Sequence, residues 1–236
     1  MEPDPTLTPG HRRLARLVDA QIAGLRSTDA ALDGLLHDLQ PLGPVAVAGG
    51  VCVAWWHGAT PRDIDLVVDV PADAISALVE KHGAPGLRRT AFGGWKLTAA
   101  GVAIDLWPLA ETWSIKREHR EPSLRALIDL VTFDWSGIAV TLDGQIVEDG
   151  WFAAMETKRL DLRYDAWPYA FMLAGKALSL HRALGAQPTP KLRAWVRAQR
   201  AEPSFTERQW RDAATRYAPN LDLGVFFAAL DRFAAG

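Results

Sequence analysis

Three aspartates in two apolar segments have the type and spacing of a metal-binding carboxylate set. Asp63 and Asp65 flank Ile64, and Asp105 lies in a later apolar run. A β-strand alternates its side chains between two faces, so Asp63 and Asp65 point the same way while Ile64 faces the core. Asp105 can join them from a neighbouring strand. Converging carboxylates repel one another unless cations lie between them, and such hard oxygen ligands suit Mg²⁺ bound with substrate phosphates. The pattern predicts a phosphoryl-transfer or nucleotidyl-transfer site.

A glycine turn precedes the first two acids. Residues 44–48 have the composition of a short buried strand and residues 51–57 that of a helix, with Gly49 and Gly50 between them. Glycine lets the backbone approach a phosphate closely, and a helix N-terminus offers unpaired N–H groups to an anion. Close strand-helix packing is the alternative for the glycines, and a solvated strand edge is the alternative for the acids. Acids are depleted in strands, which favours the site.

Helix and strand alternate along the first part of the chain, which predicts an α+β domain with a mixed sheet and flanking helices. Helices are expected within residues 9–40 and over 71–82 and 150–157, extended runs over 63–70, 87–92, 95–98 and 102–107, and a hairpin over 136–147. Residues 111–120 are polar enough for a mobile loop. The helices expected after residue 166 predict an α+β domain over residues 1–165 and a helical domain over 166–236. Residues 187–190 carry the strongest signs of an internal boundary.

Composition narrows the class of protein. The chain has 236 residues, 49% of them hydrophobic, and a net charge of −2, so no global charge indicates nucleic-acid binding. Its single cysteine, Cys52, excludes a disulfide framework and a cysteine zinc site, and a buried apolar role is expected for it. The first residues lack the pattern of a signal peptide, and no apolar stretch reaches the length of a membrane span. A soluble cytoplasmic protein without membrane partners is the expectation.

The order of these motifs resembles the DNA polymerase β-like nucleotidyltransferase superfamily. The resemblance rests on Gly49-Gly50, a helix, Arg62-Asp63-Ile64-Asp65-Leu66 and the later Ile104-Asp105-Leu106-Trp107. Within the superfamily it is closest to the head domain of CCA-adding tRNA nucleotidyltransferases and bacterial poly(A) polymerases, over about residues 45–184. Phe133-Asp134-Trp135-Ser136 followed by Gly144-Gln145-Ile146-Val147 is similar to that family's Arg-Asp-Phe-Thr segment, strand and Gly-x-Ile turn. Residues 155–160 and 168–184 resemble its lead into the neck helix.

This resemblance implies a two-metal mechanism that transfers a nucleoside monophosphate from an NTP to a hydroxyl and releases pyrophosphate. Asp63 and Asp65 would bridge two Mg²⁺ ions, and Asp105 would bind the ion nearest the attacking hydroxyl and help to deprotonate it. The chain departs from the family at Phe133 and Ile138, where the second motif has arginine and asparagine. It also lacks a Glu-Asp-x-x-Arg template segment and a long tRNA-binding tail, so CCA addition is not expected.

The candidates for nucleotide binding combine the glycine turn with charged residues: Gly49, Gly50, Arg62, Lys96, Asp134 and Lys176. Arg62 and Lys96 could neutralise triphosphate charge, and Lys176 interrupts an apolar helix face. A surface cation is the alternative for each. One tryptophan of Trp107, Trp113, Trp135 and Trp167 could stack on a base, although core packing is favoured for each. Helix capping is favoured for His57, and a solvated face for the arginines after residue 190.

Three classes of function remain open. The first is the nucleotidyltransferase, whose acceptor could be an RNA 3′ end, a small molecule such as an aminoglycoside, or a protein hydroxyl. The second is an impaired nucleotide-binding or interaction module of the same fold, suggested by Phe133 and Ile138. The third is a metal-dependent phosphatase or nuclease, which is disfavoured because the six histidines are scattered. The preferred NTP, the acceptor and the oligomeric state are not set by the sequence.

Overall fold

The computed structural model describes residues 8–83 and 86–236, and these form two compact units. The first unit contains the described residues up to Val131 together with Ser136–Asp149, and the second contains Thr132–Trp135 and Gly150–Gly236. The boundary expected at residues 187–190 was wrong, because this segment pairs with residues 159–160 inside the second unit. The division into residues 1–165 and 166–236 stays a prediction.

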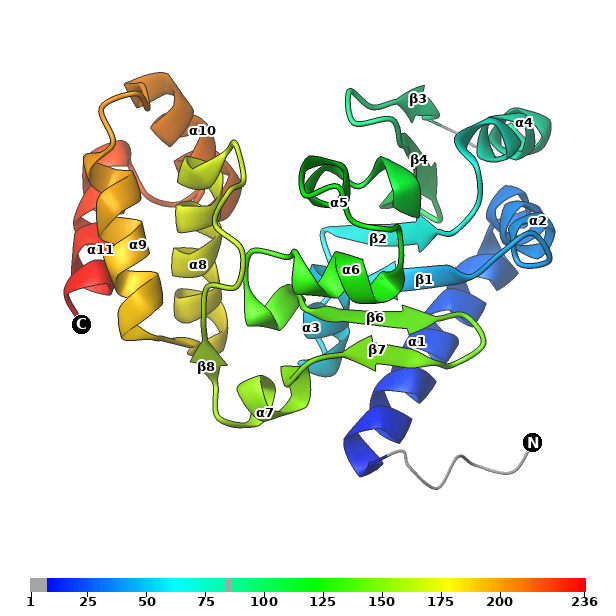
Figure 1. Cartoon of the computed structure of the whole chain (residues 1–236), viewed down its shortest axis with the longest axis horizontal. Coiled ribbons are helices and arrows are strands. Elements are labelled where there is room, and N and C mark those ends of the chain that lie inside the picture. The colour runs from blue at the N-terminus through cyan, green and yellow to red at the C-terminus, as the bar shows by residue number, and fades with distance from the viewer. Residues whose placement is uncertain (1–7, 84–85) are drawn as a thin grey trace. The chain divides into compact units, whose positions relative to one another are not determined.

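A seven-stranded mixed sheet organises the first unit (Figure 1). Its order is β3-β4-β5-β2-β1-β6-β7, in which β2 and β5 are parallel and the other neighbours are antiparallel. The strands are β1 (Val45–Ala48), β2 (Asp63–Val68), β3 (Arg88–Arg89), β4 (Trp95–Ala99), β5 (Val102–Pro108), β6 (Ile138–Thr141) and β7 (Ile146–Glu148). The predicted α+β class with a mixed sheet is confirmed.

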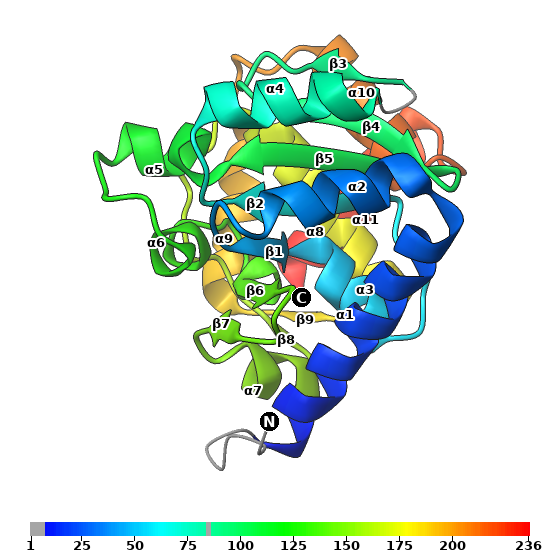
Figure 2. The same ribbon diagram turned by 90° about the vertical axis from the view of Figure 1, so that its right-hand side faces the viewer.

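Four helices lie along one face of this sheet (Figure 2): α1 (Pro9–Thr28), α2 (Ala30–Leu39), α3 (Gly50–Trp56) and α4 (Ala72–His82). Asp29 separates helix α1 from helix α2. Its carboxylate accepts the N–H of Leu32 and caps α2. Strand alternation turns Ile64 and Leu66 toward this helical layer, and each is 1% exposed. Burial on this face leaves Asp63 and Asp65 on the other one.

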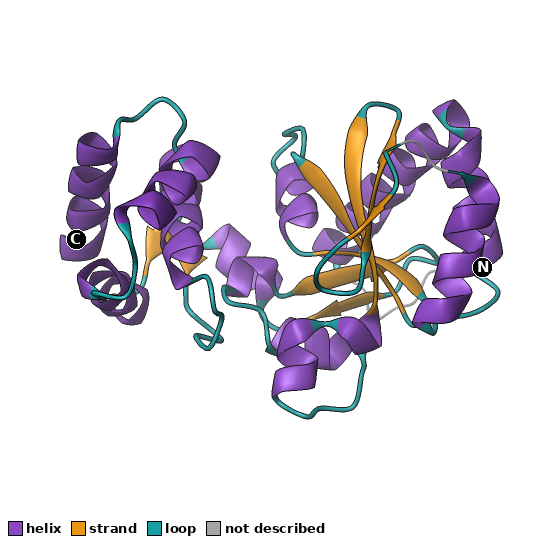
Figure 3. Ribbon diagram, turned by 90° about the horizontal axis from the view of Figure 1, so that it is seen from above, coloured by secondary structure: helices purple, strands orange, loops and turns teal. Residues whose placement is uncertain are grey.

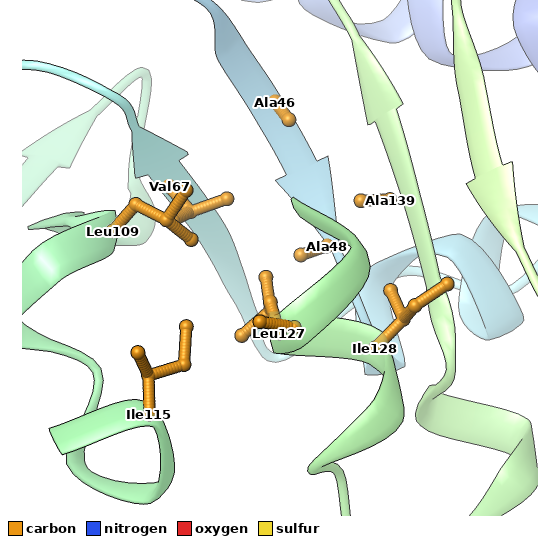
Figure 4. Close-up of a cluster of buried hydrophobic side chains, with 9 residues drawn as sticks. Ala46, Ala48, Val67, Leu109, Ile115, Leu127, Ile128 and Ala139 are labelled. Carbon is orange, nitrogen blue, oxygen red and sulfur yellow. The ribbon is translucent and has the colours of Figure 1, made fainter. Parts of the chain in front are cut away.

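Short helices partly cover the opposite face. They are the 3₁₀ turn η1 (Leu109–Glu111), α5 (Trp113–Arg117) and α6 (Leu124–Asp129). Side chains from α5 and α6 pack against small residues of the sheet in an apolar cluster (Figure 4), formed by Ala46, Ala48, Val67, Leu109, Ile115, Ala126, Leu127, Ile128 and Ala139. The mobile loop expected over residues 111–120 was wrong for this reason, since Ile115 is 1% exposed.

The second unit is mainly helical (Figure 3). The 3₁₀ turn η2 (Asp134–Ser136) begins in it, and it contains α7 (Trp151–Glu156), β8 (Arg159–Leu160), α8 (Ala170–Leu184), β9 (Gln187–Pro188), α9 (Pro190–Ala201), α10 (Glu207–Tyr217) and α11 (Leu223–Ala235). Strands β8 and β9 pair in parallel. Across the described residues, every helix is too short or too polar to span a lipid bilayer.

Candidate functional site

The candidate site lies on the face of the sheet opposite α1–α4. Asp65 of β2 stands directly beside Asp105 of the parallel neighbour β5, and Asp63 stands beside Ala103. On the other side of β5, Lys96 of β4 is the register partner of Asp105. Residues in register on neighbouring strands share a face, so these three aspartates and Lys96 project from one surface.

Two of the carboxylates already have cationic partners. Lys96 Nζ binds both carboxylate oxygens of Asp105, and Arg62 donates to Asp63 Oδ2 from Nε at 3.2 Å and from Nη2 at 3.0 Å. The side chains of Asp63 and Asp105 are 25% and 26% exposed, so each is supported by the sheet and still open to a ligand. Positive charge is therefore held at the face where the acids converge.

The site ends where the apolar cluster begins. Val67 is the next residue of β2 on the same face as Asp65, and it is fully buried among the side chains of α5 and α6. Ala46 and Ala48 lie on the same face of the adjacent strand β1, and their side chains are small. The open part of the face is thus confined to the half of β2 and β5 that carries the acids.

Gly49 connects this face to α3. Its φ of 72° and ψ of −128° form a conformation that L side chains rarely adopt, while its N–H extends the β1–β6 pairing to the carbonyl of Ile138 at 2.9 Å. Because β1 is antiparallel to β2, with Val47 opposite Leu66, the turn lies at the end of β2 that carries Asp63. Gly50 is the first residue of α3, whose side chains are all uncharged.

Cys52 lies behind the site in α3 and is fully buried, as expected from its apolar segment. Burial raises the pKa of its thiol, and the negative charge of Asp65 raises that pKa further. The cysteine is a packing residue with no thiolate character.

The three carboxylates supply the chemistry that a magnesium ion requires, because hard divalent cations prefer oxygen ligands. Among the described residues, however, no group of three or more His, Cys, Asp or Glu side chains is gathered closely enough to hold a metal ion. Lys96 and Arg62 occupy carboxylate oxygens that a metal would need. The carboxylate donors are of the type that suits Mg²⁺, and the metal ligands stay a prediction.

Asp134 is placed in the second unit and is 4% exposed. Its Oδ1 accepts the backbone N–H groups of Trp135 and Asp161, both at 2.9 Å, and its Oδ2 lies 3.3 Å from Arg159 Nη2 in an ion pair without hydrogen-bond geometry. Burial raises the pKa of this carboxyl, and the two N–H donors and Arg159 only partly oppose that rise. Through Arg159 and the N–H of Asp161, the Asp134 side chain links η2 to β8 and to the residue that follows β8.

The raised pKa of Asp134 predicts a pH effect on stability. The folded protein favours the neutral acid, so this contribution is present below the unfolded pKa of about 4 and is lost as pH rises through the folded pKa. Asp134→Asn cannot ionise, so it should become more stable relative to the parent chain as pH rises. Urea unfolding of both proteins at about pH 4 and 7 measures this change. The opposite trend would show that the ion pair with Arg159 outweighs burial.

The other sequence candidates belong to other elements of the chain. Lys176 is half-buried on α8 in the second unit. His57 caps α3 through Nδ1, which is 2.9 Å from the carbonyl of Val53. Several basic residues of the C-terminal helices have structural partners inside the unit: Lys191 Nζ donates to Leu162 O, Arg197 Nη1 to Ala234 O, and Arg211 Nη2 to Glu207. These contacts favour a structural role for part of that basic set.

The parallel β2–β5 pair, the glycine turn and the flanking helices belong to a fold that this chain shares with solved nucleotidyltransferases. Among solved structures, the chain is similar to a CCA-adding enzyme in complex with CTP, with a TM-score of 0.67 and 15% identity over 94% of this chain and 54% of that chain. A tRNA nucleotidyltransferase complexed with a primer tRNA and an incoming ATP analog gives a TM-score of 0.61 at 18% identity, covering 85% and 60% of the two chains. The Thermotoga maritima CCA-adding enzyme gives a TM-score of 0.61 at 14% identity, covering 97% and 52%.

These similarities establish the fold. The chain spans about half the length of the solved structures that it matches. No family model and no curated protein matches the sequence.

Proposed function

We propose that the protein is a magnesium-dependent nucleotidyltransferase that transfers a nucleoside monophosphate from an NTP to a hydroxyl acceptor. The observation that carries this proposal is the side-by-side placement of Asp65 and Asp105 on parallel strands, with Asp63 on the same face and the Gly49 turn at its end. Enzymes with this fold have been solved with CTP and with ATP. The carboxylate set in this fold supports nucleotidyl transfer over simple phosphate hydrolysis.

Different residues of the chain bind the triphosphate and act on the acceptor hydroxyl. The backbone at Gly49 and Gly50 admits the triphosphate closely, and Arg62 turns from Asp63 to phosphate oxygens. Asp63, Asp65 and Asp105 would hold Mg²⁺, which supplies charge neutralisation at the triphosphate and at the acceptor hydroxyl. The acceptor oxygen bonds to the α-phosphorus, the bond to the β-phosphate breaks, and pyrophosphate leaves. Asp105 takes the proton of the acceptor hydroxyl.

Lys96 has a more specific role in this scheme than the triphosphate contact expected from sequence. Its ammonium binds both oxygens of Asp105, which fixes the direction in which this carboxylate points. Lys96→Met should lower kcat about tenfold to a hundredfold and leave the KM for NTP nearly unchanged. Lys96→Arg, which keeps the charge, should recover part of the loss. Steady-state kinetics with varied NTP measures both constants, and a raised KM with unchanged kcat would assign Lys96 to the triphosphate instead.

The acceptor class is proposed from the chain's charge and motifs. A net charge of −2 and the lack of a template segment favour a short RNA end, a small molecule or a protein hydroxyl over a whole tRNA. The solved enzymes of this fold include one bound to a primer tRNA, which supports an RNA end among these choices. We place this activity in the cytoplasm, where NTPs and Mg²⁺ are both supplied.

The direct test is the mass of the product. The chain is incubated with mixed NTPs, Mg²⁺ and a set of RNA, aminoglycoside and protein acceptors, and the products are weighed by mass spectrometry while pyrophosphate is assayed. Nucleotidyl transfer adds one nucleoside monophosphate to an acceptor for each pyrophosphate released. Release of inorganic phosphate without any adduct would replace this proposal with a hydrolase.

A second function, a nucleotide-binding module without turnover, is favoured by one observation. Phe133 and Ile138 are fully buried, so the two positions where the resemblance expects polar contacts carry core side chains. Calorimetric titration with each NTP and Mg²⁺ separates the two functions. Tight binding with no pyrophosphate released across all acceptors would establish the module, whereas turnover would exclude it.

A further inference from the structure

A cavity of about 420 Å³ lies within the second unit. It forms between the C-terminal half of α8, the beginning of α9 and the length of α11. Its lining residues are Leu178, His181, Arg182, Pro188, Arg193, Leu221, Val225, Ala229, Arg232, Phe233 and Gly236. This volume is in the range of cavities that enclose small ligands.

The ionisable side chains of the lining are all basic. Arg182, Arg193 and Arg232 contribute guanidinium groups, His181 contributes an imidazole, and no lining residue is acidic. Two acids are next to lining residues in sequence, and both have other partners. The carboxylate of Asp222 caps α11 and accepts the N–H of Val225 at 2.8 Å, and Asp231 Oδ1 lies 3.7 Å from Arg200 Nε. The side chains that line the cavity therefore carry a net positive charge.

Two of the three arginines lack a protein partner. Within residues 8–83 and 86–236, the side chains of Arg182 and Arg232 take part in no hydrogen bond, ion pair or ring contact. Other arginines of the same unit do have carboxylate partners: Arg159 pairs with Asp161 and Arg211 with Glu207. Arg193 Nε donates to the carbonyl of Pro188 at 3.2 Å, which orients its guanidinium, and its Nη1 lies against Gly236 of the same lining.

Favourable interaction with helix dipoles does not explain the positions of all three arginines. Arg182 and Arg232 are in the last turns of α8 and α11, where a cation is favourable. Arg193 lies near the beginning of α9, where the dipole disfavours a cation. An anion in the cavity would pair with Arg182 and Arg232 and would offset the charge of Arg193.

The rest of the lining is apolar. Phe233 is 5% exposed and contacts the ring of His181, whose Nδ1 lies 2.7 Å from the carbonyl of Ala186. Val225 remains 45% exposed, which is high for a large aliphatic side chain. This combination suits a ligand with an oxyanion at one end and an apolar body at the other.

We propose that this cavity binds a small organic anion, with a phosphate or carboxylate group against Arg182, Arg193 and Arg232 and an apolar body against Phe233 and Val225. This site is separate from the nucleotide site proposed above. Its ligand is recognised by oxyanion and apolar surface together, and neither a base nor a magnesium ion is needed.

Isothermal titration calorimetry tests the proposal with four probes: phenyl phosphate, benzoate, inorganic phosphate and benzyl alcohol. Phenyl phosphate or benzoate should bind at least tenfold more tightly than inorganic phosphate, and benzyl alcohol should not bind. The stronger of the two anions tells whether the site prefers phosphate or carboxylate. Binding should persist in Asp63→Asn/Asp65→Asn, which removes the proposed nucleotide site and so separates the two proposals.

Arg182→Gln and Arg232→Gln are the informative variants, because neither side chain supports the fold through a partner. Each should weaken binding about tenfold with an unchanged thermal unfolding midpoint. Arg208→Gln, which removes the same charge from an exposed position of α10, should leave binding unchanged. Equal binding to the parent chain and to the Arg182→Gln/Arg232→Gln double variant would overturn the proposal. Equal affinity for inorganic and phenyl phosphate would also overturn it.

Discussion

Asp63→Asn/Asp65→Asn should abolish nucleotidyl transfer and leave the protein folded. The two carboxylates face the same side of β2, and Asp65 stands beside Asp105. Asparagine keeps the size and an oxygen ligand but removes the negative charge that attracts Mg²⁺ to the triphosphate. Loss of metal and charge stabilisation worth several kcal/mol predicts a fall in rate of about 10³-fold or more.

The measurement is transfer of label from an α-labelled NTP to the acceptor under single-turnover conditions. Asp69→Asn/Asp73→Asn is the matched control, because it removes two exposed carboxylates at the end of β2 and in α4. That control should keep its rate. Stability of the site variant should change little, because removal of two like charges from one face offsets loss of the exposed Arg62–Asp63 ion pair. Full activity in Asp63→Asn/Asp65→Asn would defeat the proposed mechanism.

The strands that carry the acids could be predicted because their sequence signal is local. Ile64 and Leu66 alternate with Asp63 and Asp65, and burial of one set fixes the exposure of the other. The pairing of Asp65 with Asp105 required a tertiary fact, the parallel contact between β2 and β5. Both acids and the family resemblance could be read from the sequence. The position of Asp65 directly beside Asp105 could be read only from the structure.

The contact between Lys96 and Asp105 was missed although its signal is in the sequence. Ala100 and Gly101 have φ of 50° and 78°, the left-handed pair of a tight hairpin turn, and they set Ala99 opposite Val102. Counting back along both strands from that turn puts Lys96 opposite Asp105. Treating residues 95–98 and 102–107 as one hairpin would have predicted the pair.

Other elements have no local signal strong enough to predict them. Helices α5 and α6 have five and six residues, too few to show helical periodicity, and they form because Ile115 and Leu127 bury against the sheet. The two-residue strands β8 and β9 exist through pairing alone, and Pro188 was taken for a boundary. Tertiary contacts decided the structure in each case.

Trp135→Ala should give the largest loss of stability in the second unit. The indole is 1% exposed and donates to the carbonyl of Arg159 at 2.6 Å, and the Trp135 carbonyl accepts the indole N–H of Trp151 at 2.9 Å. Truncation leaves a cavity and an unpaired carbonyl at the start of β8. Losses of this kind cost about 3–5 kcal/mol.

Hydrogen exchange with mass spectrometry resolves this loss, because peptides from residues 150–236 report on the second unit directly. Trp135→Phe should cost less than Trp135→Ala, since it keeps most of the apolar volume and loses the N–H donor. Trp167→Ala, which truncates a half-buried tryptophan of the same unit, is the matched control and should have the smallest effect. Equal losses in Trp167→Ala and Trp135→Ala would mean that Trp135 does not anchor β8. If Trp135 does anchor β8, which pairs with β9 immediately before α9, Trp135→Ala should also weaken anion binding through Arg193.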